Sequence, residues 1–388
     1  MIRRMVFAAA VAAALSCGPA FAASQIKLGY HVGLTGVFGI VGAEQQRGLQ
    51  LALEELGNKL GGVPISLYTV DDKGVPTEAV QVASKLIDQN KIDIVTGLMN
   101  SATLIATMNQ YLNAGVFAVS GLAGPLQYAG KECQQNAFFV AFANDVWDTA
   151  LGKFMTDKGI KSAYLMGADY QAGWEKLAGF QRTFKGKVFG PVFTPNAQLD
   201  FSAELANLRA ANPESVFVFY PGGLGIAFLK QYAQSGLKAP IYSEDTMASE
   251  LSFPAEGDSA LGVIQSTSWN AELDNPENKK FVEAFKKKFG RRPAVFAAMQ
   301  YDAIKLIDSA VAAVKGKIED KDAFRTALRK ADFKSIRGPF KFNNNHFPIQ
   351  NVYVTEVVKD DQGMRLALRG TAATNWEDDY HQTCPMKW

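Results

Sequence analysis

The sequence predicts an α/β fold with two doubly wound parallel-sheet lobes. Its length of 388 residues is enough for two domains. Short apolar runs of strand length alternate with helical patterns along most of the chain, which is typical of parallel sheets covered by helices. The alternation stops and restarts once, which places a second α/β block between two parts of the first.

The first block opens with an apolar strand and a glycine-rich turn. Glycines recur between Gly33 and Gly42 without a following Gly-Lys-Ser/Thr, so a flexible turn is favoured over a phosphate loop. Thr77 is expected to cap the second helix. Strands are predicted at residues 26–33, 63–70, 92–96 and 116–120, and helices at residues 43–57, 77–90 and from residue 101 onward.

The second block continues the same alternation. Its strands are predicted at residues 162–167, 187–193, 215–220 and 241–243, with helices that end near residues 184, 212 and 235. Residues 137–143 and 262–267 are expected to cross between the blocks. Helices at 276–289, 296–314 and 321–330 follow, then β-like segments at 339–342, 351–359 and 364–369. We therefore assign residues 24–142 with 270–340 to lobe 1, residues 143–269 with 341–370 to lobe 2, and residues 371–388 to a C-terminal tail.

The N-terminus carries a secretory signal. Two arginines precede an alanine-rich apolar run, and Ala20-Phe21-Ala22 supplies small residues for cleavage after Ala22 or Ala23. Residues 1–23 are therefore a predicted signal peptide, and the mature protein is expected in the periplasm. Cys17 is an alternative lipid-attachment site, but the leucine expected three residues before it is missing.

Two cysteines, Cys133 and Cys384, remain after signal cleavage. In an oxidising compartment they predict one disulfide that fastens the tail to the body of the chain. Two unpaired thiols are the alternative.

The stretch Gly97-Leu98-Met99-Asn100-Ser101-Ala102-Thr103 is the candidate binding segment. It follows a buried strand and leads into a helix, so backbone N–H groups and a serine hydroxyl gather at a helix N-terminus. Such a place favours an anion. In parallel sheets ligands lie beyond the carboxyl ends of the strands. We therefore expect Ser101 and its neighbours to hold the carboxylate of a small ligand.

Enzyme chemistry has no support in the sequence. The three histidines are far apart, and no His-Glu-x-x-His, Cys-x-x-Cys or Gly-x-Ser-x-Gly occurs. We expect no catalytic residues, no metal and no cofactor. The net charge of +2 and the lack of a basic tract argue against nucleic-acid binding. Asp71-Asp72 is favoured as a turn with solvated charges. Glu244-Asp245 either faces the cleft, where it could receive an ammonium or hydroxyl, or supplies a helix N-terminal charge.

Several segments, in this order, resemble the periplasmic leucine/isoleucine/valine-binding proteins. They are Ile26-Lys27-Leu28-Gly29, Leu34-Thr35-Gly36, Val70-Asp71-Asp72, residues 97–103 and residues 296–303. The resemblance implies a type I periplasmic binding fold with three crossing segments and hinge closure on one ligand. It also implies an ABC permease in the inner membrane as the partner, and a monomeric receptor is expected.

The resemblance also implies individual site residues. The carboxylate-binding serine falls on Ser101, flanked by Met99 and Asn100, and a backbone partner falls on Leu122. The acid that holds an ammonium falls on Asp245, beside Glu244, and an aromatic falls on Phe296. A family threonine is replaced by Gly124, and three cleft tyrosines are replaced by Val41, Ala172 and Gly222.

The smaller cleft residues favour a ring as the ligand. Phe38, Tyr170 and Tyr220 are further predicted binding residues, since aromatic side chains stack on phenyl rings. The tail segments 334–340 and 343–351 resemble a branch of the family associated with aromatic-acid uptake. An aromatic acid is therefore favoured, with a branched-chain or other hydrophobic amino acid as the alternative that Asp245 supports. A ligand sensor for a membrane signalling receptor is an alternative of another class.

Overall fold

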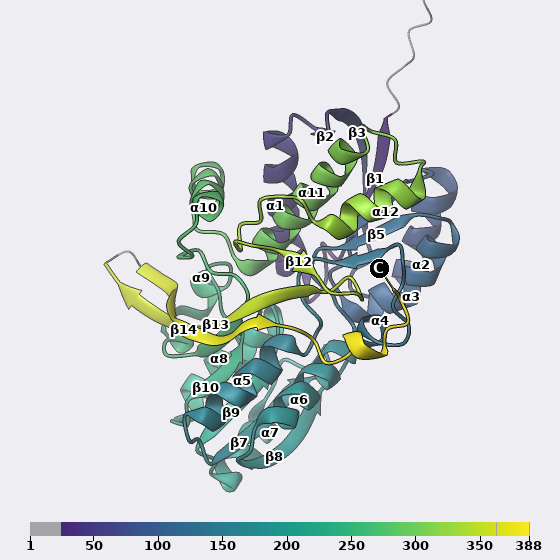
Figure 1. The fold of residues 1–388 in the computed structure, drawn as a ribbon. Helices are drawn as coiled ribbons and strands as arrows, with labels where there is room; N and C mark the ends of the chain where they lie inside the picture. Colours follow the sequence, from purple (N-terminus) through teal and green to yellow (C-terminus); the bar gives the residue numbers. More distant parts are fainter. Residues whose placement is uncertain (1–24, 362, 388) are drawn as a thin grey trace, which may run out of the picture.

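Two mainly parallel sheets, one in each lobe, form the frame of the molecule (Figure 1). The computed structural model describes residues 25–361 and 363–387. Lobe 1 is the upper half of Figure 1 and lobe 2 the lower half, and β13 and β14 lie between them. The predicted α/β fold with two lobes is confirmed.

The lobe 1 sheet has six strands in the order β2-β3-β1-β4-β5-β6. The predicted parallel pairing holds for β1 with β3 and β4, for β4 with β5, and for β5 with β6. His31, Gly97 and Ser120 lie side by side at one end of β1, β4 and β5, so the turns that follow share an edge. The strands are β1 (Ile26–Val32), β2 (Lys59–Leu60), β3 (Val63–Asp71), β4 (Ile94–Gly97), β5 (Phe117–Ser120) and β6 (Ala137–Phe139).

Helices pack on both faces of this sheet because each has an apolar stripe. Helix α1 lies directly against α11, where a Cβ on Gly48 would approach the Ala297 carbonyl to 2.1 Å. The other pair is α2 and α3, with a π-helical turn at Lys85–Gln89 prolonging α2. The helices of lobe 1 are α1 (Gly39–Glu55), α2 (Pro76–Ser84), α3 (Ser101–Asn113), α4 (Leu126–Ala129), α10 (Pro276–Phe289), α11 (Val295–Ala313) and α12 (Lys321–Lys330).

The lobe 2 sheet runs in the order β8-β7-β9-β10-β11-β13-β12, with β14 paired to β13. Strands β7 to β11 pair in parallel, and β13 joins β11 antiparallel. Separate apolar clusters cover its two faces. The strands are β7 (Ser162–Ala168), β8 (Lys187–Thr194), β9 (Ser215–Phe219), β10 (Ile241–Glu244), β11 (Ile264–Thr267), β12 (Lys341–Phe342), β13 (Pro348–Asp360) and β14 (Gly363–Trp376). The helices are α5 (Val146–Asp157), α6 (Gln171–Thr183), α7 (Ser202–Ala211), α8 (Gly223–Ser235) and α9 (Phe253–Glu256).

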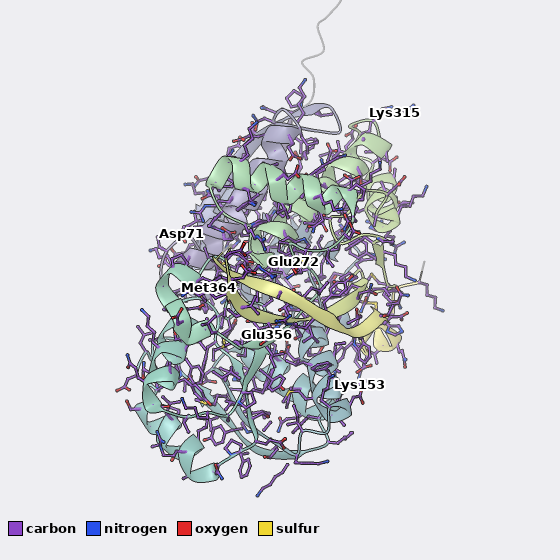
Figure 2. All side chains as sticks on the ribbon, turned by 90° about the vertical axis from the view of Figure 1, so that its left-hand side faces the viewer. Asp71, Lys153, Glu272, Lys315, Glu356 and Met364 are labelled. Atoms are coloured by element: carbon purple, nitrogen blue, oxygen red, sulfur yellow. A yellow bond between two sulfur atoms is a disulfide. The ribbon has the colours of Figure 1, made fainter. Side chains whose placement is uncertain are left out.

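The chain passes between the lobes three times. It enters lobe 2 between β6 and α5, returns between β11 and α10, and crosses again along β13. Figure 2 shows β13 and β14 running across the junction of the two halves. Residues 137–143 and 262–267 were predicted to cross between the blocks as strands. In the structure, β6 and β11 instead pair in parallel within their own lobes, and the chain crosses after each of them.

Several predicted boundaries are corrected by the structure. The predicted tail from residue 371 begins inside β14, which runs to Trp376 because it pairs with β13 along its length. Phe342, Phe347 and Val352 pack into the lobe 1 core, although residues 341–370 were assigned to lobe 2. Helix α2 is capped by Val75, not Thr77, since Pro76 takes the first helical position.

The prediction of solvated charges at Asp71-Asp72 is wrong for Asp72. Its carboxylate is buried and lies 3.2 Å from His31 Nε2. His31 in turn hydrogen-bonds the Tyr111 hydroxyl through Nδ1 at 2.7 Å. Asp71 accepts hydrogen bonds from the Leu34 amide and from the Thr35 hydroxyl. Both carboxylates therefore fix the strand ends around the turn, and only Asp72 is shielded from solvent.

The predicted disulfide between Cys133 and Cys384 is confirmed, with a Cα–Cα distance of 5.7 Å. Asn345 Nδ2 also donates to both oxygens of Asp378, at 3.0 and 2.9 Å. The Tyr380 hydroxyl donates to Asp145 at 2.9 Å. The tail is therefore fixed on the body of the chain by one covalent bond and by buried polar contacts.

The predicted signal peptide, residues 1–23, and Cys17 lie outside the described residues. Within the described part, no helix combines the length and the apolar character that crossing a membrane requires.

Candidate functional site

A cavity of about 40 Å³ lies where the two lobes meet. Lobe 1 contributes turns that follow β1, β4 and β5, and lobe 2 contributes α6 and the ends of β9 and β10. The lining residues are Phe38, Val41, Met99, Asn100, Ser101, Leu122, Ala123, Phe142, Asn144, Tyr170, Ala172, Lys176, Phe219, Pro221, Glu244, Thr246 and Phe296.

The floor of the cavity in lobe 1 is the predicted stretch after β4. Gly97 has φ +95°, and a Cβ there would approach the His31 carbonyl to 2.4 Å, so the turn requires glycine. Asn100 caps α3, and its Oδ1 accepts from the amides of Ala102 at 2.8 Å and Thr103 at 3.2 Å. The prediction that this helix end offers its N–H groups to an anion therefore needs correction, because Asn100 occupies two of them.

Ser101 is the polar group of this floor, and its exposed fraction is 2%. Its Oγ accepts a hydrogen bond from Asn144 Nδ2 at 3.0 Å. A hydroxyl that accepts one bond can still donate its own proton. Asn144 is fixed as well, since its Oδ1 accepts from the Gly124 amide at 3.1 Å and its Nδ2 also donates to Glu175 at 2.7 Å.

Gly124 shows why this chain lacks a threonine at that position. A Cβ there would lie 1.9 Å from the Phe142 carbonyl oxygen, a backbone atom that cannot move aside cheaply. The first crossing segment therefore passes directly against the turn after β5, and Asn144 of this segment accepts a hydrogen bond from the Gly124 amide.

The lobe 2 wall carries a buried ion pair between Lys176 of α6 and Glu244 of β10. Lys176 Nζ also donates to the Asn144 carbonyl at 2.7 Å and lies 3.5 Å from an oxygen of Asp148. The second oxygen of Glu244 accepts a hydrogen bond from the Thr246 hydroxyl. Both carboxylate oxygens of Glu244 are therefore engaged within the protein.

Burial and charge act against each other in this group. Burial disfavours the ammonium of Lys176, but Glu244 and Asp148 outweigh it and raise the pKa of Lys176. Burial raises the pKa of Asp148 well above its usual range, although Lys176 opposes that shift. The geometry therefore favours a charged Lys176 held against Glu244, with Asp148 as a second acidic neighbour.

Aromatic side chains form most of the remaining wall. The rings of Phe38 in lobe 1 and Tyr170 in lobe 2 are 5.9 Å apart across the junction, and Tyr170 lies 6.1 Å from Phe219. Phe142 and Phe296 also line the cavity. A flat apolar group with one anionic end suits this combination of rings and a serine.

Seven of the nine predicted binding residues line the cavity. They are Phe38, Met99, Asn100, Ser101, Leu122, Tyr170 and Phe296. Tyr220 does not line it, because it is buried beside Phe201 and its hydroxyl accepts from Thr194 at 2.8 Å. Asp245 does not line it either; it follows the last residue of β10 and is buried outside the cavity wall. Burial raises the pKa of Asp245 well above its usual range.

Sequence reasoning missed Lys176, Asn144 and Thr246. A signal for Lys176 exists, because it lies four residues from both Ala172 and Phe180, which are buried on α6. A lysine within such an apolar stripe indicates a buried partner. Asn144 has no comparable signal, since its role depends on where the crossing segment meets α3.

Within residues 25–361 and 363–387, no group of three or more His, Cys, Asp or Glu side chains could hold a metal ion.

A family model described as periplasmic binding protein matches residues 25–362. The chain belongs to the periplasmic binding protein family. These proteins are transport receptors and not enzymes, which confirms the predicted absence of an enzyme activity. Membership also implies a periplasmic location, a small-molecule ligand and a permease partner for this binding protein.

A curated relative of this binding protein is the Leu/Ile/Val-binding protein homolog 6 of Brucella melitensis. It is 26% identical over 380 residues, which cover 93% of this chain and 95% of that protein. The resemblance predicted from the sequence is confirmed.

Solved structures support the aromatic branch. An ABC transporter solute-binding protein of R. palustris in complex with benzoate is 30% identical, with a TM-score of 0.88, covering 92% of this chain and 99% of that one. A solute-binding protein of Rhodopseudomonas palustris BisB5 in complex with 3,4-dihydroxybenzoic acid is 26% identical, with a TM-score of 0.83 and the same coverage. This binding protein is therefore an ABC transporter solute-binding protein.

Proposed function

We propose that the chain is the periplasmic receptor for a small aromatic carboxylate, which it delivers to an ABC permease. The observation that carries the ligand class is the state of Glu244. It is the only carboxylate among the described residues that line the cavity, and both its oxygens are bonded to Lys176 and Thr246. A ligand with an ammonium group would find no free carboxylate there.

The carboxylate end of the ligand is assigned to Ser101. Its hydroxyl faces the cavity at the start of α3, where the helix dipole also favours negative charge. Asn144 holds this hydroxyl from behind. The ring of the ligand would lie among Phe38, Tyr170 and Phe219, where its apolar faces leave water.

Closure around the ligand is part of the proposal. Phe38 and Tyr170 meet across the junction, and Glu175 of lobe 2 accepts a hydrogen bond from the Leu126 amide of lobe 1 at 3.1 Å. A ligand that contacts both lobes would stabilise this closed arrangement by its extra contacts. We expect the receptor to be a monomer in solution.

A hydrophobic amino acid is the second candidate. The names of the curated relatives favour it, because they are Leu/Ile/Val-binding protein homologues. The paired state of Glu244 and the absence of Asp245 from the cavity lining argue against it.

Calorimetric titration of the mature protein tests the proposal. Benzoate, 4-hydroxybenzoate, leucine, isoleucine and valine are titrated separately under the same conditions. We expect saturable heat with at least one benzoate and none with the amino acids. Binding of leucine without binding of either benzoate would refute the aromatic assignment.

Ser101→Ala tests the carboxylate end. Losing a hydrogen bond to a charged group costs about 1.5–3 kcal/mol, so we expect affinity for benzoate to fall by about 10- to 150-fold. Ser309→Ala is the matched control, because Ser309 bonds only the Leu306 carbonyl within its own helix. Equal affinity of the Ser101 variant and the control would remove Ser101 from the site.

A further inference from the structure

We propose that Lys176 is the specificity-determining residue of the cavity, because its ammonium occupies the place that the ammonium of an amino acid would need. This inference rests on the proposed function and adds the mechanism by which amino acids are rejected. The cation that pairs with Glu244 is therefore a residue of helix α6.

The position of Lys176 Nζ is that of a bound ammonium group. It lies between the Glu244 carboxylate and the Asn144 carbonyl oxygen, which accepts a hydrogen bond from Nζ at 2.7 Å. An oxygen of Asp148 lies 3.5 Å away. An ammonium has three donors, and a carboxylate with a nearby backbone carbonyl is a typical set of acceptors for them.

Aromatic rings complete this surrounding. Nζ lies 4.7 Å from the centre of the Phe142 ring, 5.1 Å from that of Phe219 and 5.9 Å from that of Trp147. Cations are attracted to ring faces at such distances. Phe142, Phe219, Lys176 and Glu244 all line the cavity, so this ammonium site belongs to the cavity itself.

Occupation of the site by Lys176 has two effects on a ligand. A second ammonium would meet a cation at close range and would have no free carboxylate to compensate its lost hydration. A ligand carboxylate meets a Glu244 that is already neutralised, so it enters without a like-charge penalty. Both effects favour acids without an amino group.

Helix α6 also determines how much space the ligand has beside Lys176. The stem of Lys176 enters from α6, one turn after Ala172, and the small side chain of Ala172 leaves the neighbouring wall open. Space for a ring and rejection of an ammonium therefore come from residues one turn apart on the same helix.

Lys176→Met tests this inference, since methionine keeps most of the stem and removes the charge. Calorimetry with benzoate and leucine is performed on wild type, on Lys176→Met and on Lys153→Met. The control Lys153 is on lobe 2 (Figure 2), is not among the residues that line the cavity, and has a side chain that is 50% exposed. In Lys176→Met we expect leucine to give saturable heat, which wild type does not give, because the like charge of Lys176 is gone. The ratio of benzoate affinity to leucine affinity should therefore fall by about a hundredfold or more from the lower bound that the wild-type detection limit sets. The control should retain the wild-type ratio.

Two further variants test whether the freed carboxylate of Glu244 is what allows leucine to bind. In Lys176→Met with Glu244→Gln no carboxylate that lines the cavity is freed, since Asp148 is not among the lining residues, so we expect no leucine binding. Lys176→Gln, which is neutral but can still donate toward Asn144, replaces the methionine variant if that one does not fold. An unchanged ratio in the neutral Lys176 variant would overturn the inference, as would leucine binding by the double variant. A wild type that binds no aromatic acid would instead overturn the proposed function, which keeps the two failures distinct.

Discussion

Removing the Cys133–Cys384 bridge is expected to destabilise the protein strongly without affecting ligand binding. The two cysteines are separated by 251 residues. On the chain-entropy model, freeing a loop of that length lowers the free energy of unfolding by about 5.5 kcal/mol at most. The buried contacts of Asp378 and Tyr380 remain in the folded variant, but they cannot restrict the unfolded chain.

The perturbation is the double substitution Cys133→Ser with Cys384→Ser, which leaves no free thiol at the bridge. Urea unfolding followed by tryptophan fluorescence measures the change, and wild type with a reducing agent is the control that should match the variant. Among the described residues, none beyond Phe296 lines the cavity, so benzoate affinity should stay at the wild-type value. A loss of less than about 1 kcal/mol would refute the entropic reasoning. A large drop in ligand affinity would refute the separation of tail and cavity.

Two other predictions concern positions beside the site and within lobe 1. Gly124→Thr should lower the urea midpoint of unfolding sharply, because its Cβ would lie 1.9 Å from the Phe142 carbonyl oxygen. The control Gly223→Ala should keep the wild-type midpoint, since a Cβ there meets only ordinary contacts near 3.5 Å. Equal midpoints for the two variants would contradict this reasoning. Burial lowers the pKa of His346 to about 3, well below its value of about 6.5 in the unfolded chain. Between these two pH values the unfolded chain binds a proton on His346 that the folded protein does not bind. The free energy of unfolding therefore decreases as the pH falls from 6.5 toward 3. Between pH 7 and pH 5 this amounts to about 2 kcal/mol, which urea unfolding should show for wild type and not for His346→Asn; identical pH dependence would contradict the assignment.

Most of the fold could be predicted from local sequence patterns. The helices at Pro276–Phe289 and Lys321–Lys330 follow their predicted bounds, because each combines helical periodicity with a clear N-cap and a left-handed C-cap. The tail boundary at residue 371 was wrong because β14 is defined by its partner β13, and such pairing has no local signature. Thr77 was a plausible cap by type, but Pro76 takes the first helical position and the N-cap position falls on Val75, two residues earlier.

The predicted site residues also divide into those that local patterns placed correctly and those whose position depends on the fold. Ser101 and Asn100 follow directly from a strand, a polar turn and a helix in sequence, so their position at the lobe junction could be predicted. Tyr220 was plausible as an aromatic after a strand, but the alternation of side chains along β9 directs it into the lobe 2 core.

The sequence by itself determined that the chain has two α/β lobes, a bridge between its two mature cysteines, and a serine at a helix start that suits a carboxylate. Periodicity, cysteine count and turn chemistry are local properties, so they can be read along the chain. Only the tertiary structure decided that Lys176, rather than a ligand, neutralises Glu244, and that Asn144 holds Ser101 from behind. Those contacts join residues that are 68 and 43 positions apart. They exist because two lobes and a crossing segment meet at one point, and no local pattern encodes that meeting.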